Sequence, residues 1–273
     1  MSRKAIFLDI DGTILSDDHN VPRINKAMMH RAIDEGHTVV INTGRPVKGA
    51  LHIVDKLEFT KPGCYLLSYN GSILYDCNKR EIVDMKTLDA DRVIPVLKAA
   101  IDEGIHCHTY DDNQILVPLG NDTELDFYRT ITRLPYQENV PFEEFKNYNL
   151  QKVMLIDLED HEKLERFKEK YENTFSDYFQ CFFSDVRYLE FVKRGVNKGT
   201  AIYDFCDRFG IDRENTIAVG DEENDIDMIK SAYIGVAMKN AKDTVKAVAD
   251  VVTERDNNQG GVAEIIEKYM LCN

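Results

Sequence analysis

Two aspartates separated by one residue follow the first apolar segment of the chain. Ile6-Phe7-Leu8 leads directly into Asp9-Ile10-Asp11-Gly12-Thr13. In an extended strand, residues i and i+2 face the same side, so both carboxylates would point into one space. Adjacent carboxylates repel each other unless one is protonated or a cation lies between them. Mg²⁺ is a hard cation that takes oxygen ligands, and Gly12 would let the backbone turn sharply beside a ligand. The alternative is an acidic turn after an edge strand.

Two further loops carry groups that suit a phosphoryl oxygen. Thr43-Gly44-Arg45 follows a second apolar run. Its hydroxyl and backbone N–H groups, with the dipole of the next helix, could bind such an oxygen, and Arg45 could grip a substrate anion. Asn70-Gly71-Ser72 follows a third apolar run and would reach the same edge. Turn chemistry alone could explain both loops, so the two interpretations stay open.

Lys198 opens a helical segment late in the chain. A lysine at a helix N-terminus is unfavourable for the helix dipole, which suggests a role such as neutralising phosphoryl charge. A solvated surface lysine is the alternative.

Acidic residues cluster once more after an apolar run in Gly220-Asp221-Glu222-Glu223-Asn224-Asp225. Asp221 could complete a metal site, and Asp225 lies one helical turn away on the same side. Asn224 could hydrogen-bond a phosphoryl group. The alternative is an acidic helix N-terminus that complements the dipole, and we expect this of Glu222 and Glu223.

Alternating strands and helices must position these residues. Continuous apolar strands separated by helices predict an α/β fold with a doubly wound parallel sheet covered on both faces. Ligands bind at the carboxyl ends of the strands in such a sheet. The expected strands are 4–10, 38–41, 64–69, 216–219, 233–237 and 250–253, with a hairpin over 72–85 that turns at 77–79. The expected helices are 22–35, 197–209, 223–231, 241–248 and 262–270.

The middle of the chain has a different pattern. Helices over 88–103 and 161–174 alternate with paired runs across short polar turns, which predict antiparallel hairpins. The paired runs are 105–110 with 114–117, and 178–184 with 188–192. We therefore expect an inserted α+β cap domain at 86–192, joined by a hinge to a core domain formed by 1–85 and 193–273. Four residues of the insertion are candidates for lining the site: Asp111, Asp112, Asn113 and Arg187.

Composition limits the partners of the chain. Its 273 residues carry a net charge of −14, which disfavours nucleic acid and anionic membranes. The same surface would repel a phosphorylated substrate unless a bound cation reversed the field locally. Six cysteines with no C-x-x-C pair indicate thiols in a reducing compartment. No apolar run reaches the roughly 20 residues of a membrane helix. We expect a cytoplasmic chain that is a monomer or a weak homo-oligomer.

Together the motifs resemble the haloacid dehalogenase superfamily of phosphohydrolases, and within it the Cof-like subclass IIB. The resemblance covers nearly the whole chain, including the position of the cap. The first motif of the family matches Asp9-Ile10-Asp11-Gly12-Thr13, and the second matches Thr43-Gly44-Arg45. Lys198 matches the third, and Gly220-Asp221 with Asn224-Asp225 the fourth. Asn70-Gly71 is similar to a loop of the subclass, but Ser72 stands where alanine is common and Glu222 where a smaller or amide residue is usual.

The resemblance implies a reaction and the residues that carry it. Asp9 would be the nucleophile that forms an aspartyl phosphate, and Asp11 the general acid and base. Mg²⁺ would be held by the Asp9 carboxylate, the Asp11 backbone carbonyl and the Asp221 carboxylate. Asp225 would either be a further ligand or contact the metal ligands without binding the metal. Further residues would bind or stabilise the phosphoryl group: Gly12, Thr43, Gly44, Arg45, Asn70, Gly71, Lys198 and Asn224. The cap would close over the site and select the leaving group. The implied substrates are small phosphorylated metabolites, with sugar phosphates the first class and other phosphomonoesters such as pyridoxal phosphate behind them.

Three other functions are alternatives to hydrolysis. A phosphohexomutase would share Asp9 and Asp11 but return the phosphoryl group to a second sugar hydroxyl. A phospho-receiver module would keep a long-lived acyl phosphate, which a neighbouring acid and base such as Asp11 disfavours. A two-carboxylate glycosidase needs groups that flank the sugar bond from opposite sides, whereas residues two apart on one strand lie beside each other.

Overall fold

The structure is a computed structural model that describes residues 2–111, 114–120, 123–132 and 134–271. Asp112 and Asn113, two of the candidates for lining the site, lie outside the described residues. The chain divides into two compact units. The first unit comprises Met1–Arg45, Ala50–Met85 and Asn197–Asn273, and the second comprises Pro46–Gly49 and Lys86–Val196.

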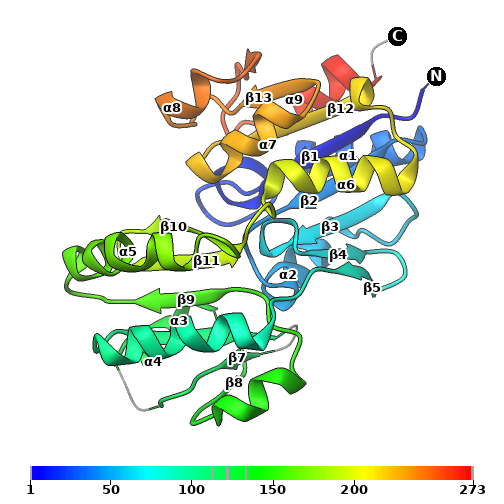
Figure 1. The fold of residues 1–273 in the computed structure, drawn as a ribbon. Coiled ribbons are helices and arrows are strands. Elements are labelled where there is room, and N and C mark those ends of the chain that lie inside the picture. Colours follow the sequence, from blue (N-terminus) through cyan, green and yellow to red (C-terminus); the bar gives the residue numbers. More distant parts are fainter. Residues whose placement is uncertain (1, 112–113, 121–122, 133, 272–273) are drawn as a thin grey trace. The chain divides into compact units, whose positions relative to one another are not determined.

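An eight-stranded sheet forms the centre of the first unit among the described residues (Figure 1). Six neighbouring strands run parallel, and the last two turn back as an antiparallel hairpin at one edge. In their order across the sheet, the strands are β14 (Val251–Val252), β13 (Ile234–Ala237), β12 (Thr216–Gly220), β1 (Ala5–Leu8), β2 (Thr38–Asn42), β3 (Cys64–Ser68), β4 (Ile73–Asp76) and β5 (Glu81–Met85). The predicted α/β fold class is confirmed.

Helices cover both faces of this sheet (Figure 1). On one face, Phe205 of α6 (Lys198–Phe209) packs edge-on against Phe7 of β1 and Tyr65 of β3, with ring centroids 5.5 and 5.2 Å apart. On the other lie α1 (Arg23–Asp34) and α9 (Gly261–Ile266), which contact each other. The remaining helices of this part of the chain are α2 (Val47–Leu57), α7 (Ile226–Ser231) and α8 (Asp243–Lys246).

The start of α6 follows from its sequence. The Asn197 side chain accepts a hydrogen bond from the backbone N–H of Thr200 at 2.8 Å, and the Thr200 hydroxyl accepts one from the backbone N–H of Asn197 at 3.0 Å. This reciprocal capping fixes the first turn. The helix ends at Gly210, whose φ of 63° is left-handed and suits glycine. Lys198 is thereby held at the first position of a well-fixed helix.

Several predicted elements are shorter than the sequence pattern suggested. The first strand ends at Leu8, and the chain then turns through Gly12 at φ 72°. The helix expected over 223–231 begins with a 3₁₀ turn, Glu223–Asp225, and becomes α7 only at Ile226. The helix expected over 241–248 is confined to the four residues of α8. Sequence patterns locate such elements better than their ends, because loop contacts decide where each element stops.

The second unit contains a six-stranded sheet among its described residues. Both predicted hairpins are present, since β6 (His106–Tyr110) pairs with β7 (Ile115–Leu116) and β10 (Phe179–Asp185) with β11 (Tyr188–Lys193) in antiparallel register. The sequence did not predict β8 (Tyr136–Gln137), β9 (Val153–Ile156) or α4 (Thr123–Thr132). In order across the sheet, the strands are β10 (Phe179–Asp185), β11 (Tyr188–Lys193), β9 (Val153–Ile156), β6 (His106–Tyr110), β7 (Ile115–Leu116) and β8 (Tyr136–Gln137).

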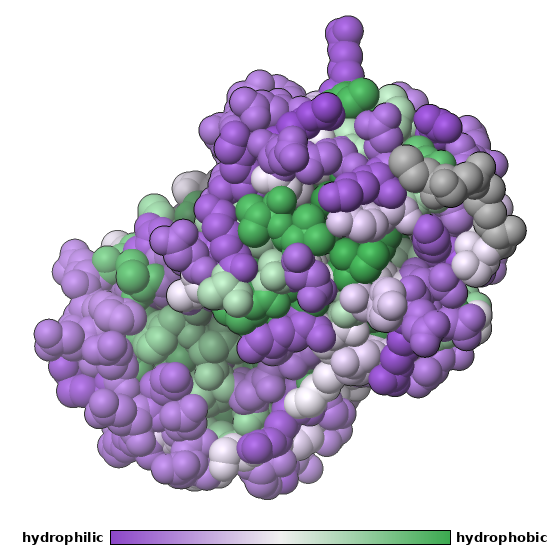
Figure 2. Space-filling model, turned by 90° about the horizontal axis from the view of Figure 1, so that it is seen from above, coloured by the Kyte–Doolittle hydropathy of each residue, from purple (hydrophilic) through white to green (hydrophobic). Residues whose placement is uncertain are grey.

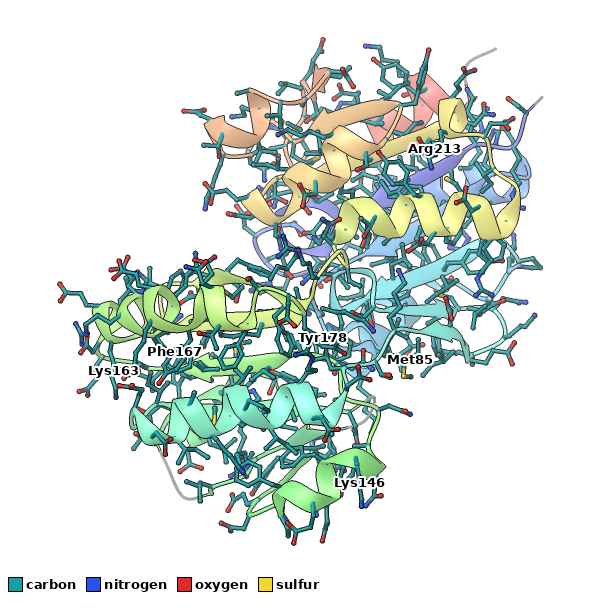
Figure 3. The ribbon with its side chains drawn as sticks, viewed as in Figure 1. Met85, Lys146, Lys163, Phe167, Tyr178 and Arg213 are labelled. Carbon is teal, nitrogen blue, oxygen red and sulfur yellow. The ribbon has the colours of Figure 1, made fainter. Side chains whose placement is uncertain are left out.

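The two faces of this second sheet differ in chemistry. Two helices, α3 (Ala90–Asp102) and α5 (His161–Phe175), supply an apolar core. Phe167 of α5, labelled in Figure 3, packs edge-on against Phe191 of β11 with ring centroids 6.2 Å apart. Strand alternation places another set of side chains on the opposite face, and there a buried ion pair joins Lys152 to Glu190 at 2.8 Å. The second unit therefore buries charge as well as apolar surface.

Hydrophilic side chains cover most of the molecular face drawn in Figure 2, and the hydrophobic areas on it are smaller. In the described part of the chain, no helix combines the length and the apolar character required to cross a membrane.

Candidate active site

The predicted site residues of the first unit follow neighbouring parallel strands. Asp221 comes after β12, Asp9 after β1, Thr43 after β2 and Asn70 just beyond β3, and these four strands are adjacent in the sheet. Backbone hydrogen bonds continue past the strand ends, from the N–H of Asp9 to Val219 at 3.1 Å and from that of Asn70 to Thr43 at 2.9 Å. The carboxyl edge of the sheet therefore gathers these loops, as expected for an open α/β sheet.

Three carboxylates meet in this region. Asp9, Asp221 and Asp225 are all buried, and each offers a carboxylate oxygen within 4.8 Å of the others. Burial raises the pKa of Asp9 to about 7, against the opposing charge of Lys198, and the charge of Asp225 adds to the rise. Burial likewise raises the pKa of Asp221 to about 8, and the neighbouring carboxylates contribute. Three buried oxygen donors that repel one another fit a hard divalent cation, which would favour their charged forms.

Lys198 supplies the positive charge that the chain itself places here. Its Nζ donates to Asp9 Oδ1 and to Asp225 Oδ1, both at 2.6 Å, and its side chain is 1% exposed. Burial alone would lower the pKa of Lys198, but the charges of Asp225 and Asp9 outweigh burial and hold that pKa above its usual range. The interpretation of Lys198 as a solvated surface lysine is therefore wrong.

Asp225 also fixes the loop that carries Asp221. Its Oδ2 accepts the backbone N–H groups of Asp221 and Glu222 at 3.0 and 3.1 Å. At Gly220 a Cβ would lie 2.5 Å from the Asp225 side chain, so only glycine leaves room there. Oδ1 of Asp225 thus pairs with Lys198, and Oδ2 holds the backbone of the loop that carries Asp221.

The loop after β1 is tied to the same carboxylate cluster. Thr13 Oγ1 donates to Asp221 Oδ1 at 2.7 Å. A Cβ on Gly12 would lie 2.1 Å from Asp221 Oδ2, and Gly12 has a φ of +72°, so this position requires glycine. The Asn240 side chain donates to the Gly12 carbonyl at 2.8 Å.

Three of these supporting residues were missed from the sequence. Thr13 lies inside the first motif, and its hydroxyl next to Gly12 was the available signal. Asn240 bonds to Gly12, and the Asn42 side chain donates to the Lys198 carbonyl at 3.0 Å. Both are amides outside any local motif, so no sequence pattern indicates their partners.

Asp11 lies outside the carboxylate cluster, contrary to the prediction that Asp9 and Asp11 point into one space. The prediction assumed a strand through residue 10, but β1 ends at Leu8, so side chains no longer alternate at Asp9 and Asp11. Instead, Arg45 Nε and Nη2 donate to the two oxygens of Asp11 at 2.9 and 2.6 Å. The Asp11 side chain is 54% exposed, against 10% for Asp9.

The loops after β2 and β3 fit closely together. Thr43 is buried, and its Oγ1 accepts the backbone N–H of Arg45 at 3.2 Å. A Cβ at Gly44 would lie 3.1 Å from Asn70 Oδ1. Gly71 has a φ of +94°, and its Cβ would lie 2.3 Å from the Ala201 side chain, so this glycine lets the loop approach α6. Packing therefore accounts for Gly71 without a ligand.

The remaining candidates of the fourth motif lie at the surface. Asn224 is exposed. Glu222, the acidic departure from the family pattern, pairs with Lys242, whose Nζ lies 2.8 Å from Glu222 Oε2. The extra negative charge at position 222 thus has a local counter-ion.

The described candidates of the second unit are engaged in turns of their own strands. Arg187 donates to both oxygens of Asp185 at 2.7 and 3.0 Å, and Asp111 accepts the backbone N–H of Gln114 at 2.8 Å.

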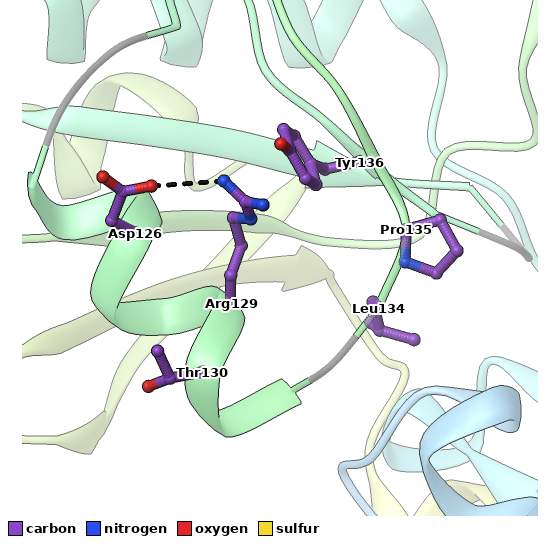
Figure 4. A pocket seen from close by; sticks show the side chains of 6 residues that line it. All are labelled: Asp126, Arg129, Thr130, Leu134, Pro135 and Tyr136. Atoms are coloured by element: carbon purple, nitrogen blue, oxygen red, sulfur yellow. Dashed lines mark hydrogen bonds and ion pairs between the residues drawn. The ribbon is translucent and has the colours of Figure 1, made fainter.

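An open pocket also lies in this unit (Figure 4). An ion pair of 3.2 Å between Asp126 and Arg129 spans part of it, and the Arg129 guanidinium lies over the Tyr136 ring, 3.7 Å from its centroid. The lining is completed by Thr130, Leu134 and Pro135.

Comparisons with known proteins identify the family. A sequence profile of the haloacid dehalogenase-like hydrolases matches residues 6–266, so the chain belongs to this family. The 5-amino-6-(5-phospho-D-ribitylamino)uracil phosphatase YcsE of Bacillus subtilis is 29% identical over 276 residues, which cover 98% of this chain and 96% of that protein. The phosphatase YwpJ of the same organism is 28% identical over 290 residues, covering 98% of this chain and 100% of that protein.

The fold is also that of a solved member of the family. The crystal structure of a haloacid dehalogenase-like hydrolase from Bacteroides thetaiotaomicron superposes with a TM-score of 0.86 at 28% identity, covering 98% of this chain and 99% of that chain. The family predicted from the four motifs is confirmed, and so is its class of enzyme, a phosphatase.

Proposed function

We propose that the protein is a Mg²⁺-dependent phosphomonoester hydrolase that acts through an aspartyl phosphate on Asp9. The observation that carries this proposal is the buried Asp9 carboxylate, which lies 2.6 Å from Lys198 and shares a cluster with Asp221 and Asp225. A charged lysine beside a buried carboxylate favours its ionised form, and only the ionised form is a nucleophile.

The acidic cluster would hold the metal. Asp9, Asp221 and Asp225 offer the oxygen donors, and the resemblance adds the backbone carbonyl of Asp11. When bound, Mg²⁺ supplies positive charge that lets an acidic protein accept a dianionic ester and stabilises the phosphoryl group during transfer. Because Asp225 already accepts from Lys198 and from two backbone N–H groups, we infer that it mainly positions the other groups.

The chain's own residues then carry two transfers. In the first, an Asp9 oxygen attacks phosphorus, the bond to the leaving oxygen breaks, and Asp11 gives that oxygen a proton. In the second, water attacks the phosphorus of the aspartyl phosphate and gives its proton to Asp11. The phosphorus–Asp9 bond breaks, and phosphate and the Asp9 carboxylate are released. Lys198 and Thr43 stabilise the phosphoryl group in both transfers.

We propose small phosphorylated metabolites as substrates, with a phosphate ester on a polyhydroxylated carbon chain as the first class to test. The sequence prediction of sugar phosphates supports this, as does the relative YcsE, which is named for a phosphoribityl substrate. The second unit would select the leaving group. Among the described cysteines, Cys64, Cys77, Cys181 and Cys206 are free thiols, which fits the cytoplasmic location predicted for the chain.

A phosphate-release screen tests the proposed function. Sugar phosphates, phosphoribityl compounds, pyridoxal phosphate and p-nitrophenyl phosphate would be assayed with Mg²⁺ and with a chelator, using Asp9→Asn as the blank. We expect release that requires both Mg²⁺ and Asp9. Normal turnover by the Asp9→Asn variant would exclude the nucleophile, and conversion of a hexose 1-phosphate to a 6-phosphate without phosphate release would identify a mutase.

A further inference from the structure

The ion pair between Asp11 and Arg45 joins two loops of the first unit. Arg45 donates from Nε and Nη2 to the two Asp11 oxygens, at 2.9 and 2.6 Å. This bidentate contact, a guanidinium fork, fixes the direction of the carboxylate as well as its distance. The Asp11 side chain is 54% exposed and the Arg45 side chain 32% exposed. An ion pair this exposed contributes little to folding stability. The effect of the Asp11–Arg45 pair is therefore to orient the Asp11 carboxylate.

The backbone on each side of the pair is anchored independently. The Gly12 carbonyl, next to Asp11, accepts from the Asn240 side chain at 2.8 Å. The Arg45 N–H donates to Thr43 Oγ1 at 3.2 Å, and the Arg45 carbonyl accepts from the N–H of Tyr69 at 3.1 Å. With both backbones fixed, the fork determines which way the Asp11 side chain points.

We propose that Arg45 is a positioning residue, which holds the Asp11 carboxylate beside the acidic cluster and in place to accept the proton of the attacking water. This inference rests on the proposed function. A guanidinium fork matches an ionised carboxylate, and Asp11 is ionised when it acts as the base that hydrolyses the aspartyl phosphate. The fork also keeps Asp11 from turning towards the cluster as an additional ligand.

The sequence suggested another role for Arg45, gripping the anion of the substrate, and kinetics separate the two. In the positioning role, loss of Arg45 slows the second transfer, in which water's proton passes to Asp11 as the phosphorus–Asp9 bond breaks. In the gripping role, it weakens substrate binding and the first transfer. p-Nitrophenyl phosphate distinguishes these cases, because nitrophenolate is a leaving group that needs no proton from Asp11. With this substrate, the loss of Asp11 positioning should slow only the second transfer.

The experiment compares the variants Arg45→Gln and Arg45→Lys with the wild type in rapid-mixing assays on p-nitrophenyl phosphate and Mg²⁺. We expect Arg45→Gln to release one equivalent of nitrophenol in a burst and then to turn over roughly tenfold to a hundredfold more slowly. KM should fall together with kcat, so that kcat/KM is nearly unchanged. Arg45→Lys keeps the positive charge but loses the bidentate contact. Its steady-state turnover should therefore lie between those of the wild type and Arg45→Gln.

Two controls make the result specific. Because Arg45 acts through Asp11, adding Arg45→Gln to Asp11→Asn should cause no further loss in steady-state rate. Arg31→Gln removes an exposed arginine–glutamate contact of 3.0 Å in the same unit, with Glu35, and should leave the kinetics unchanged.

A raised KM with a reduced kcat/KM and no burst, or unchanged kinetics in Arg45→Gln, would overturn the positioning role. If the wild type fails to hydrolyse p-nitrophenyl phosphate, or Asp9→Asn hydrolyses it normally, the proposed function fails instead, so the two failures are distinguishable.

Discussion

Replacing Lys198 by methionine removes the only positive side chain bonded to the buried carboxylates in the described cluster. Lys198 Nζ lies 2.6 Å from one oxygen of Asp9 and 2.6 Å from one oxygen of Asp225. Methionine fills a similar volume but leaves these carboxylates without their partner. We expect the metal-free variant to be less stable and the Mg²⁺-bound variant to recover part of that loss.

The size of the effect follows from the geometry. At 2.6 Å and an effective dielectric constant of about 20, each pair contributes roughly 6 kcal/mol of attraction. Removing Lys198 from water offsets several kcal/mol of this, and deletion of one partner of a buried pair costs about 3–5 kcal/mol. Since burial already raises the pKa of Asp9 to about 7, the carboxylates can take up a proton at low pH. The loss should therefore be larger at pH 8 than at pH 6.

Lys152→Met is the matched control for this experiment. Lys152 is also a buried lysine, paired with Glu190 at 2.8 Å, with both side chains 6% exposed, but it lies in the second unit. We expect both variants to lose stability in urea denaturation with chelator present. Added Mg²⁺ should stabilise Lys198→Met by about 2.7 kcal/mol at a hundred times the Kd of this variant. At the same Mg²⁺ concentration it should stabilise the wild type less, because only in the variant does the cation replace a missing charge. Lys152→Met should gain no more than the wild type.

Equal stability of Lys198→Met and the wild type in chelator would show that Lys198 does not stabilise the buried carboxylates. Equal stabilisation of both lysine variants by Mg²⁺ would show that the cation does not replace the charge of Lys198.

Three further substitutions test other parts of the structure. Burial holds the pKa of His108 well below 6.5, so the unfolded chain binds a proton there that the folded chain does not. Stability should fall as pH drops below about 6.5, by up to about 1.4 kcal/mol per pH unit, and His108→Gln should flatten this slope in urea titrations at pH 7 and 5. Gly12→Ala places a Cβ 2.1 Å from Asp221 Oδ2, so thermal melts should lose their Mg²⁺-dependent shift; a preserved shift would contradict the close approach. Thr13→Val removes a bond that lowers the pKa of Asp221, so calorimetry should show about tenfold weaker Mg²⁺ binding at pH 7 that recovers at higher pH; equal binding would show that the bond has no such effect.

The sequence predicted where the site lies because the end of each parallel strand can be recognised from the residues around it. Apolar runs that end in Asp9, Thr43 and Asp221 identify the carboxyl ends of their strands, and a parallel sheet brings those ends to one edge. Lys198 could be placed near that edge because its helix returns the chain to the sheet. The order of elements therefore sufficed for the fold of the first unit and for the members of the cluster, but not for β8, β9 and α4 of the second unit.

The features that were predicted wrongly or missed depend on contacts between residues far apart in the sequence. The direction of Asp11 was predicted from strand alternation, which stops at Leu8, and its partner Arg45 comes from a different loop. Asn240 and Asn42 act through single side-chain bonds to the Gly12 and Lys198 carbonyls. Periodicity carries no information on such bonds, since they depend on the packed geometry.

Chemical identification of the phosphorylated residue would establish whether Asp9 is the nucleophile. The Asp11→Asn variant retains Asp9 but lacks the base for the second transfer, and p-nitrophenyl phosphate needs no acid for the first. After mixing with Mg²⁺ and rapid quenching, mass spectrometry should find a phosphoryl group on the peptide that contains Asp9, in nearly one equivalent per chain. A phosphoryl group on another residue, or steady phosphate release with no phosphorylated protein, would exclude an aspartyl phosphate on Asp9.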